Sequence, residues 1–297
     1  MNAQFCPLES KLACPFQRSG PMVNRTGESG DVGIDVCQRC GMGLTWPELA
    51  DTESLYVGRD SAEFNRATGV ARLLKTIFFR RQAAGIIRAC GQPPAHVLDI
   101  GCGNGLWTRC LGDLLPSSSV WGVDFHDAPP AELEDRRYLP MSQLFAARRE
   151  GADLVVAFHV LEHVNDPIQL LTRLRSLLKP GGHLALEVPN IACIWGRIFG
   201  KYWDPWYLPY HRLHFNRQSL QLALERCGFS VAYIENATSP SFGRSLATAL
   251  GRRNTTFFIL LTAFLQPIQL LAEWATNRPS VLRAVARRTD KQVAGKA

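Results

Sequence analysis

The fold is decided by the stretch Val97-Leu98-Asp99-Ile100-Gly101-Cys102-Gly103-Asn104-Gly105. Its apolar first half is typical of a buried strand, its second half carries glycine at every second position, and a helix is expected from about Leu106. Glycine lets a ligand approach the backbone where any Cβ would clash. A dinucleotide-binding loop needs a further glycine to pack its helix on the strand, and Leu106 occupies that position. The pattern therefore does not predict a pyrophosphate site.

Outward from this loop, short apolar segments alternate with helical ones. We expect strands at residues 96–100, 119–124, 153–159, 183–188 and 229–234, and helices at about 167–178 and 218–227. The segment 153–159 is continuously apolar, as expected of a strand buried on both faces. This alternation predicts an α/β fold with a doubly wound parallel sheet. Residues 135–149, where another strand should fit, are ambiguous.

The glycine loop resembles motif I of class I S-adenosylmethionine (SAM)-dependent methyltransferases. In that family an acid on the first strand helps to hold the methionine end of SAM, and an acid ending the next strand binds both ribose hydroxyls. Asp99 and Asp124 stand at these two positions, and one carboxylate can accept two hydroxyl protons. The resemblance implies a Rossmann-like seven-stranded sheet. It also implies a set of SAM-binding residues: Asp99, Gly101, Cys102, Gly103, Gly105, Asp124, Phe158 and His159.

Three further segments resemble the ubiquinone-biosynthesis type of methyltransferase. They are residues 158–167, similar to "LEH…DP", residues 178–190, similar to "LKPGG…PN", and residues 209–229, similar to "P-H-x-x-H-F…L-x-x-x-G-F". The resemblance covers roughly residues 93–236 and implies methyl transfer, most often to oxygen. No acid aligns where the family usually offers one near adenine, so the adenine contact is unassigned.

A hydroxyl acceptor must lose a proton, and histidine suits this task with an unperturbed pKa of about 6.5. Four histidines lie in the matching segments: His159, His163, His211 and His214. We expect His163 or His211 to be the catalytic base. The aromatic run at residues 202–210 predicts either a lid over an amphipathic or sugar-like acceptor, or a simple packed loop.

We expect residues 1–58 to form a zinc-ribbon-like segment, and residues 59–92 a helix that connects it to a methyltransferase domain at 93–297. Cys37 and Cys40, followed by Gly41, place two thiolates on a tight turn. Tetrahedral zinc needs four ligands, and Cys6 and Cys14 are the other early candidates. Residues 40–56 resemble the segment after the second knuckle of methyltransferases with an N-terminal zinc ribbon. The C-x7-C spacing of the first pair leaves a ribbon without metal as the alternative.

The C-terminal tail is basic and apolar. The chain has a net charge of +7, and residues 244–297 carry nine basic and two acidic side chains. Residues 257–274 are apolar but are interrupted by Gln266, Pro267 and Glu273, which argues against a clean membrane span. Two alternatives remain: a kinked pair of helices packed on the domain, or peripheral membrane contact through residues 252–278.

The end of the tail predicts a strand. Residues 281–287 are expected to pair antiparallel with residues 229–234. Residues 237–279 then form a helical insertion.

With 46% apolar and 20% charged residues, the composition excludes a disordered or fibrous chain. The start has no apolar targeting segment, so we expect a cytoplasmic protein, with or without peripheral contact to the inner face of a membrane. The predicted function is SAM-dependent methylation of a small molecule, at a hydroxyl of a saccharide, quinone-like or lipid-linked intermediate.

Methylation of RNA or protein is the alternative within enzymes. Residues 93–243 carry 13 basic and 15 acidic side chains, which argues against RNA, and no nucleic-acid partner is expected. A non-catalytic SAM-binding or zinc-ribbon interaction module is the alternative outside enzymes. The intact glycine loop with Asp99 and Asp124 disfavours it.

Overall fold

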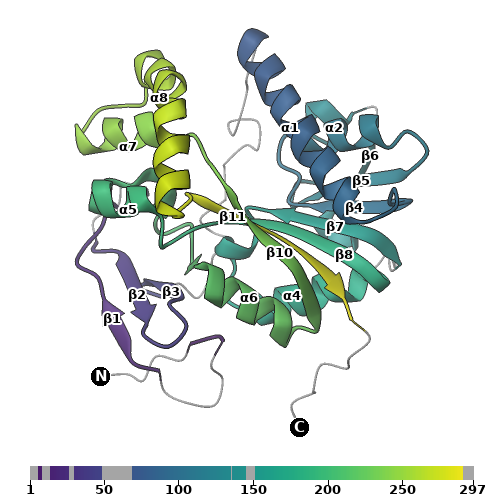
Figure 1. The fold of residues 1–297 in the computed structure, drawn as a ribbon, viewed down its shortest axis with the longest axis horizontal. Helices are drawn as coiled ribbons and strands as arrows, with labels where there is room; N and C mark the ends of the chain where they lie inside the picture. The colour runs from purple at the N-terminus through teal and green to yellow at the C-terminus, as the bar shows by residue number, and fades with distance from the viewer. Residues whose placement is uncertain are drawn as a thin grey trace.

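The computed structural model describes residues 6–8, 14–26, 30–48, 69–134, 136–144 and 151–289. Its main layer is a seven-stranded sheet in the order β10-β11-β8-β7-β4-β5-β6 (Figure 1). These strands are β4 (His96–Ile100), β5 (Ser119–Asp124), β6 (Arg137–Pro140), β7 (Ala152–Phe158), β8 (Leu178–Pro189), β10 (Phe229–Ala237) and β11 (Val281–Arg288). β11 runs antiparallel to both of its neighbours, and the strands from β8 to β6 run parallel to one another. The predicted doubly wound α/β fold is confirmed.

Helices cover both faces of the sheet. α1 (Gly69–Ala89) and α2 (Leu106–Leu114) lie on one face, and α4 (Pro167–Leu177) and α6 (Arg217–Arg226) on the other (Figure 1). Along β7, Leu154 and Val156 pack toward α1 and α2, whereas Val155 and Ala157 pack toward the opposite face. β7 is therefore continuously apolar because both of its faces are buried.

Two segments of the sheet differ from expectation. Residues 179–182, between the predicted helix at 167–178 and the predicted strand at 183–188, belong to β8. The pairing with β7 shifts between Ala152–Leu178 and Leu154–His183 and lets these residues bulge. The ambiguous segment contains the missing edge strand β6, followed by the short α3 (Met141–Leu144). Residues 135 and 145–150 of that segment lie outside the described part of the chain.

The N-terminal segment forms a second, four-stranded sheet in the order β1-β2-β3-β9. β1 (Phe16–Arg18), β2 (Gly33–Cys37) and β3 (Gly43–Trp46) come from the N-terminal segment, but β9 (Leu213–His214) comes from the segment before α6. Figure 1 shows this small sheet beside the main one. The small sheet is therefore completed by the segment that carries the predicted histidines. Residues 49–68, which include the start of the predicted connecting helix, lie outside the described residues.

The tail forms α7 (Phe242–Ala249) and α8 (Thr256–Thr276) between β10 and β11, so the antiparallel pairing of the last two strands is confirmed. Of the two alternatives for this segment, a pair of helices within residues 257–274 does not form, because α8 continues through Pro267 as one helix. Thr262 and Gln269, on either side of Pro267, both bond to the α7 region and hold the two halves on one surface. Proline removes one helical hydrogen bond, and these contacts offset it.

Candidate functional site

The glycine loop is tied to the end of β5. The backbone N–H groups of Gly101 and Cys102 donate to the Val123 carbonyl at 2.8 and 3.0 Å. The N–H of Gly103 donates to Oδ2 of Asp124 at 2.7 Å. Motif I and the second acid, which are 21 residues apart in sequence, thus meet at the carboxyl ends of adjacent parallel strands. Ligands bind at this edge in open α/β sheets.

The three glycines of the loop have different roles. All adopt positive φ, +72° at Gly101, +55° at Gly103 and +80° at Gly105. A Cβ at Gly101 would lie 2.6 Å from Val160, and one at Gly105 would lie 2.5 Å from Leu133. A Cβ at Gly103 would meet nothing within 4 Å. Gly101 and Gly105 therefore permit close packing within the protein, and Gly103 leaves open space in which a ligand fits against the backbone.

Asp99 is buried beneath the loop. Thr108 on α2 donates its hydroxyl proton to Oδ2 of Asp99. Burial raises the pKa of Asp99 to about 7, the hydrogen bond from Thr108 lowers it, and the nearby negative charge of Asp124 raises it further. Asp99 is thus poised to ionise when a cation approaches. Sequence reasoning missed Thr108, which lies in the first turn of the helix after the loop.

The other predicted SAM-binding residues lie at the same edge. Cys102 is buried in the loop, and the ring of Phe158 packs edge-on against Trp107 at 4.9 Å. His159 adopts φ +55°, a conformation that is uncommon outside glycine. Its ring lies between two carboxylates, with Nδ1 at 3.1 Å from Glu162 and Nε2 at 3.7 Å from Glu187.

Both predicted base candidates lie in one cluster. The rings of His163 and His211 contact edge to face, with centroids 4.8 Å apart. His163 Nδ1 lies 3.1 Å from the Tyr210 carbonyl, and His211 Nδ1 lies 2.9 Å from the Pro205 carbonyl. Because a carbonyl can only accept, each Nδ1 carries the proton, and each Nε2 of the neutral ring keeps its lone pair. Both rings are therefore held in a tautomer that can accept a proton at Nε2.

Glu162 joins the histidines and was not foreseen as a functional residue. It is fully buried, its Oε1 lies 3.1 Å from His159 Nδ1 and 4.0 Å from His211 Nε2, and its Oε2 has no hydrogen-bond partner among the described residues. A buried polar atom without a partner is costly. The quoted "LEH" motif contained this residue, but only the tertiary structure shows its burial beside His211.

The surroundings raise the pKa of one histidine in the cluster and lower the pKa values of two others. Burial lowers the pKa of His163, and burial together with the neighbouring histidines lowers that of His211 well below its usual value. Burial also lowers the pKa of His159, but the hydrogen bond to Glu162 and the charges of Glu162 and Glu187 outweigh it, so the net shift is upward. His163 and His211 are therefore neutral near pH 7.

The small sheet holds this cluster in place. The Thr45 hydroxyl lies 2.9 Å from His214 Nε2 and also donates to the His211 carbonyl. The guanidinium of Arg212 donates to the carbonyls of Thr45 and Pro47, both at 3.2 Å. Residues 43–47 thus fix both ends of the 211–214 segment, a link across more than 160 residues of sequence.

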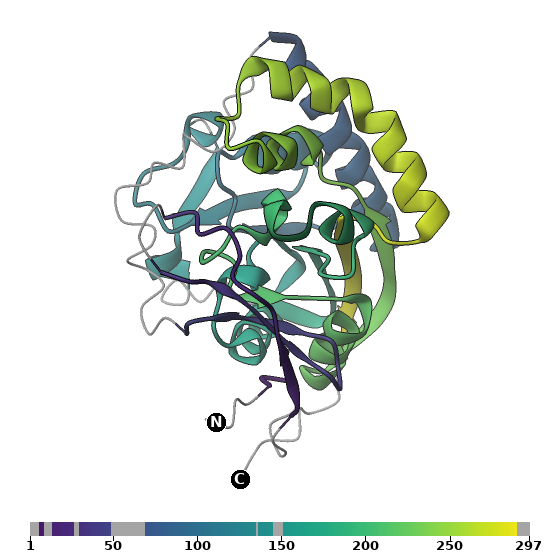
Figure 2. The ribbon, with the colours of Figure 1, turned by 90° about the vertical axis from the view of Figure 1, so that its left-hand side faces the viewer.

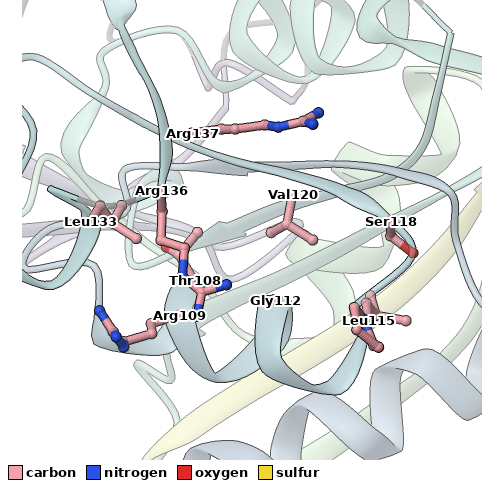
Figure 3. Close-up of a pocket in the computed structure, with 10 residues that line it drawn as sticks. Thr108, Arg109, Gly112, Leu115, Ser118, Val120, Leu133, Arg136 and Arg137 are labelled. Carbon is pink, nitrogen blue, oxygen red and sulfur yellow. The ribbon is translucent and has the colours of Figure 1, made fainter.

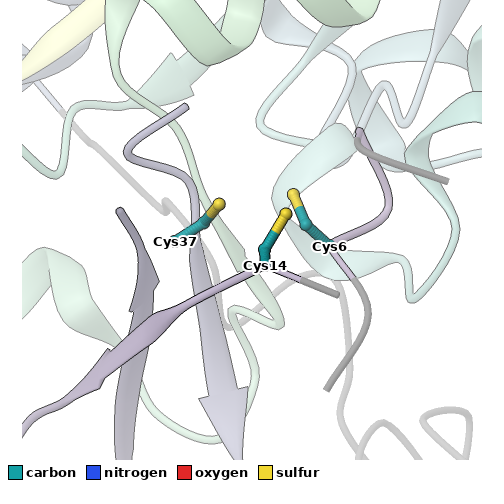
Figure 4. Close-up of side chains that lie close together, drawn as sticks. All are labelled: Cys6, Cys14 and Cys37. Atoms are coloured by element: carbon teal, nitrogen blue, oxygen red, sulfur yellow. The ribbon is translucent and has the colours of Figure 1, made fainter. Parts of the chain in front are cut away.

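The four predicted metal ligands lie together and are buried. Sγ of Cys6 lies 3.5 Å from Sγ of Cys40, and the sulfurs of Cys6, Cys14 and Cys37 lie within 4.8 Å of one another. Figure 4 shows the last three directed into the same space. Tetrahedral zinc, at about 2.3 Å from each sulfur, requires sulfurs roughly 3.8 Å apart. Three of the sulfurs therefore lie close enough to share one zinc ion, and Cys40, in contact with Cys6, is the candidate for the fourth ligand.

A separate cavity of about 370 Å³ lies between α2 and the strands β5 and β6 (Figure 3). Arg109, Arg136 and Arg137 are among its lining residues. None of the predicted site residues lines it, and Ser118 and Val120 place it near the amino-terminal end of β5. Thr108, which donates to Asp99, and Leu133, beside Gly105, also line the cavity, but no residue of the glycine loop does.

Comparison with known proteins agrees with the fold and the loop. Residues 69–234 match the family model described as "Methyltransferase domain". The chain therefore belongs to this family, and its seven-stranded sheet with motif I defines it as a class I SAM-dependent methyltransferase.

Two curated proteins are similar to part of the chain. One is trans-aconitate 2-methyltransferase of Variovorax paradoxus, 35% identical over 103 residues, which are 32% of this chain and 39% of the relative. The other is ubiquinone biosynthesis O-methyltransferase of Acinetobacter baumannii, 29% identical over 114 residues, which are 35% of this chain and 47% of the relative. The chain spans less than half the length of these relatives.

A solved structure shares the fold over most of the chain. It is the plantazolicin methyltransferase BpumL in complex with a pentazolic desmethylPZN analog and SAH, with a TM-score of 0.51 and 18% identity. The match covers 80% of this chain and 94% of that one. At this identity the likeness shows the fold alone.

Proposed function

We propose that this protein transfers the methyl group of SAM to a hydroxyl of a small molecule. The observation that carries the proposal is the contact between the glycine loop and the histidine segment. The Val160 side chain occupies the space that a Cβ at Gly101 would need. The buried Glu162 and the neutral His163 come just after Val160 in the chain, and the neutral His211 lies beside both of them. The predicted donor site and the predicted base are therefore neighbours.

When bound, SAM supplies an electrophilic methyl group that needs alignment with the acceptor more than activation. The open face of Gly103 would receive the ligand. Asp124 would bind the ribose hydroxyls, and Asp99 would face the ammonium group of the methionine end. Each carboxylate already lies at the carboxyl edge of its strand.

His211 is the proposed base. Its Nε2 lone pair would accept the proton of the acceptor hydroxyl, and the positive charge that forms would lie 4.0 Å from the carboxylate of Glu162. A carboxylate beside the base stabilises the imidazolium and holds the ring. His163, in ring contact with His211, would help to orient it and is the alternative base.

The four cysteines would hold one structural zinc ion. Zinc would tie Cys6 and Cys14 to the turn between β2 and β3, which carries Cys37 and Cys40. Because β3 pairs with β9, this tie would support the segment that carries His211.

The acceptor class rests on two supports. The name of one relative specifies an O-methyltransferase of ubiquinone biosynthesis, and rings stack beside the base, with Tyr207 and Tyr210 at 4.8 Å. Both favour a hydroxyl on an amphipathic molecule, such as a quinone-like, saccharide or lipid-linked intermediate. The mildly acidic composition of residues 93–243 disfavours RNA.

The test is transfer of labelled methyl from SAM into fractions of a cell extract. We expect one small-molecule fraction to be labelled by the wild type and by Glu225→Gln, a change on the exposed side of α6, but not by His211→Ala. Labelling confined to protein or RNA, or equal labelling by His211→Ala, would contradict the proposal.

A further inference from the structure

The helix α8 has the reverse of the usual pattern, with its polar side chains facing the protein. Glu273 is buried and accepts hydrogen bonds at Oε1 from Trp195 at 2.9 Å and at Oε2 from Thr238 at 2.6 Å. Gln269 is buried and donates to the Ser239 carbonyl at 2.8 Å. Surface helices normally turn an apolar stripe toward the core and a polar face toward water.

The outward side of α8 is apolar. Its exposed large side chains are Phe257, Ile259, Leu260, Phe264, Ile268, Leu270, Leu271 and Trp274. Phe264 and Trp274 are each 79% exposed. An apolar patch of this kind marks a site of contact with a protein, a membrane or a ligand. Within the described part of the chain, nothing covers it.

A second helix at the same end of the molecule also exposes apolar side chains. On the first half of α1, Leu73, Leu74, Ile77 and Phe78 are exposed. α1 and α8 both project from the same end of the molecule (Figure 1), and they still share that end after a quarter turn (Figure 2). We call the exposed apolar residues of these two helices the apolar end.

The positive charge of the tail favours an anionic lipid surface over a second copy of the chain as the partner of the apolar end. Arg252 and Arg253 are exposed just before α8, and the helix's own charged residue, Glu273, faces inward. A second copy docked on the apolar end would bring two basic tails together. An anionic lipid surface would neutralise them while it received the apolar side chains.

α8 is long and apolar enough to cross a bilayer, with a mean hydropathy of 1.5 over its best 18 residues. However, Thr262, Gln269 and Glu273 bond it to the protein along its length, and β11 begins five residues after its end. Crossing the bilayer would leave these buried polar groups unpartnered in hydrocarbon.

We propose that the apolar end docks on the surface of an anionic membrane, with α8 lying in the interface and its polar stripe still bonded to the protein. The aromatic segment before the predicted base packs against the same helix, since Trp195 and Trp203 share a cluster with Phe242 and Ala272. Docking would therefore hold the acceptor side of the enzyme at the lipid surface. This inference does not depend on the proposed methyl transfer.

Co-sedimentation with vesicles of phosphatidylcholine, with and without phosphatidylglycerol, tests the proposal. We expect the full chain to sediment with the anionic vesicles, and high salt to weaken binding without abolishing it, because salt screens the arginines but not apolar burial. The double substitution Leu260→Ser with Phe264→Ser should lower the partition coefficient at least tenfold. Both side chains are exposed, so the fold should survive, which circular dichroism and SAM binding would verify.

A charge-reversal variant tests the role of the arginines and has its own control, and light scattering tests the rival occupant. Arg252→Glu with Arg253→Glu should remove the preference for anionic lipid, whereas Arg173→Glu, on the exposed side of α4, should not. No sedimentation of the wild type with anionic vesicles at low salt would overturn the proposal. A dimer in light scattering that becomes monomeric in the Leu260→Ser, Phe264→Ser variant would assign the apolar end to a second copy and would also overturn it.

Discussion

At the scale of single residues, Asp124 has a measurable role in the proposed function. Asp124→Asn keeps the size of the side chain but removes its charge. Hydrogen bonds to charged groups contribute about 1.5–3 kcal/mol each, so we expect SAM affinity to fall at least tenfold in titration calorimetry. Glu225→Gln is the matched control on the distant α6. Unchanged affinity in Asp124→Asn would show that Asp124 does not bind the ribose.

Asp99 predicts a proton linked to SAM binding. Its pKa of about 7 leaves the buried carboxyl partly protonated at neutral pH. The positive charge of bound SAM would favour the carboxylate, so binding near pH 6.5 should release a fraction of a proton. Calorimetry in two buffers with different ionisation enthalpies measures this number, and Asp99→Asn should bring it to zero. Identical apparent enthalpies for the wild type in both buffers would contradict the prediction.

His211 predicts the pH profile of the enzyme. A base must be neutral to act, and burial holds the pKa of His211 well below its usual value. At saturating SAM, where the ionisation of Asp99 no longer limits binding, we expect kcat/KM for the acceptor to stay level as the pH falls to 6.5 and to decline only in more acidic solution. His211→Ala should lower kcat by about 10²–10⁴ with little change in SAM affinity. A plateau that ends above pH 7 would point to another base.

At the scale of elements, the pairing of β3 with β9 links the cysteine cluster to the segment that carries His211. We expect about one zinc per chain by metal analysis. Cys37→Ser with Cys40→Ser should remove the metal and lower kcat, because β3 would no longer hold the segment with His211. SAM affinity should change little, since the glycine loop belongs to the other sheet.

Cys90→Ser is the control for that experiment, because Cys90 lies outside the cluster, after α1. Two outcomes would count against the structural role of zinc. One is a metal content near zero in a folded wild type. The other is a parallel loss of kcat and SAM affinity, which would indicate general unfolding.

At the scale of the whole molecule, the buried histidines should make stability depend on pH. Burial lowers the pKa of His214 to about 3, whereas an unfolded chain titrates near 6.5. Below pH 6.5 the unfolded state therefore binds a proton at His214 that the folded state does not bind. The free energy of unfolding should then fall by about 1.4 kcal/mol per pH unit for this residue. The contribution is fully present above pH 6.5.

Urea unfolding between pH 6.5 and 5 measures this slope. Asp99 acts in the opposite direction, because its raised pKa makes the folded state bind the extra proton. The comparison with variants isolates each residue. His214→Gln should flatten the slope by about one proton, whereas His126→Gln, at an exposed position, should not. An unchanged slope in His214→Gln would contradict the burial of a neutral ring.

Much of the main sheet could be predicted because its signals are local. The glycine loop, its flanking strand and the acid that ends β5 lie within about thirty residues, and each follows from spacing and chain conformation. β7 was recognised because burial on both faces demands a continuous apolar run. β6 could not be placed within the ambiguous residues 135–149, because a short edge strand needs no such pattern. The start of β8 was missed because lysine, proline and glycine indicate a turn.

The sequence by itself thus determined the class of fold, the loop that is predicted to bind the ligand and the set of chemical groups available for a site. Only the tertiary structure decided which of these groups meet. The pairing of β3 with β9, the burial of Glu162 beside His211 and the inward turn of the polar stripe of α8 all join segments distant in sequence. Local propensity carries no information about such contacts, because they form only when the packed sheets bring their partners together.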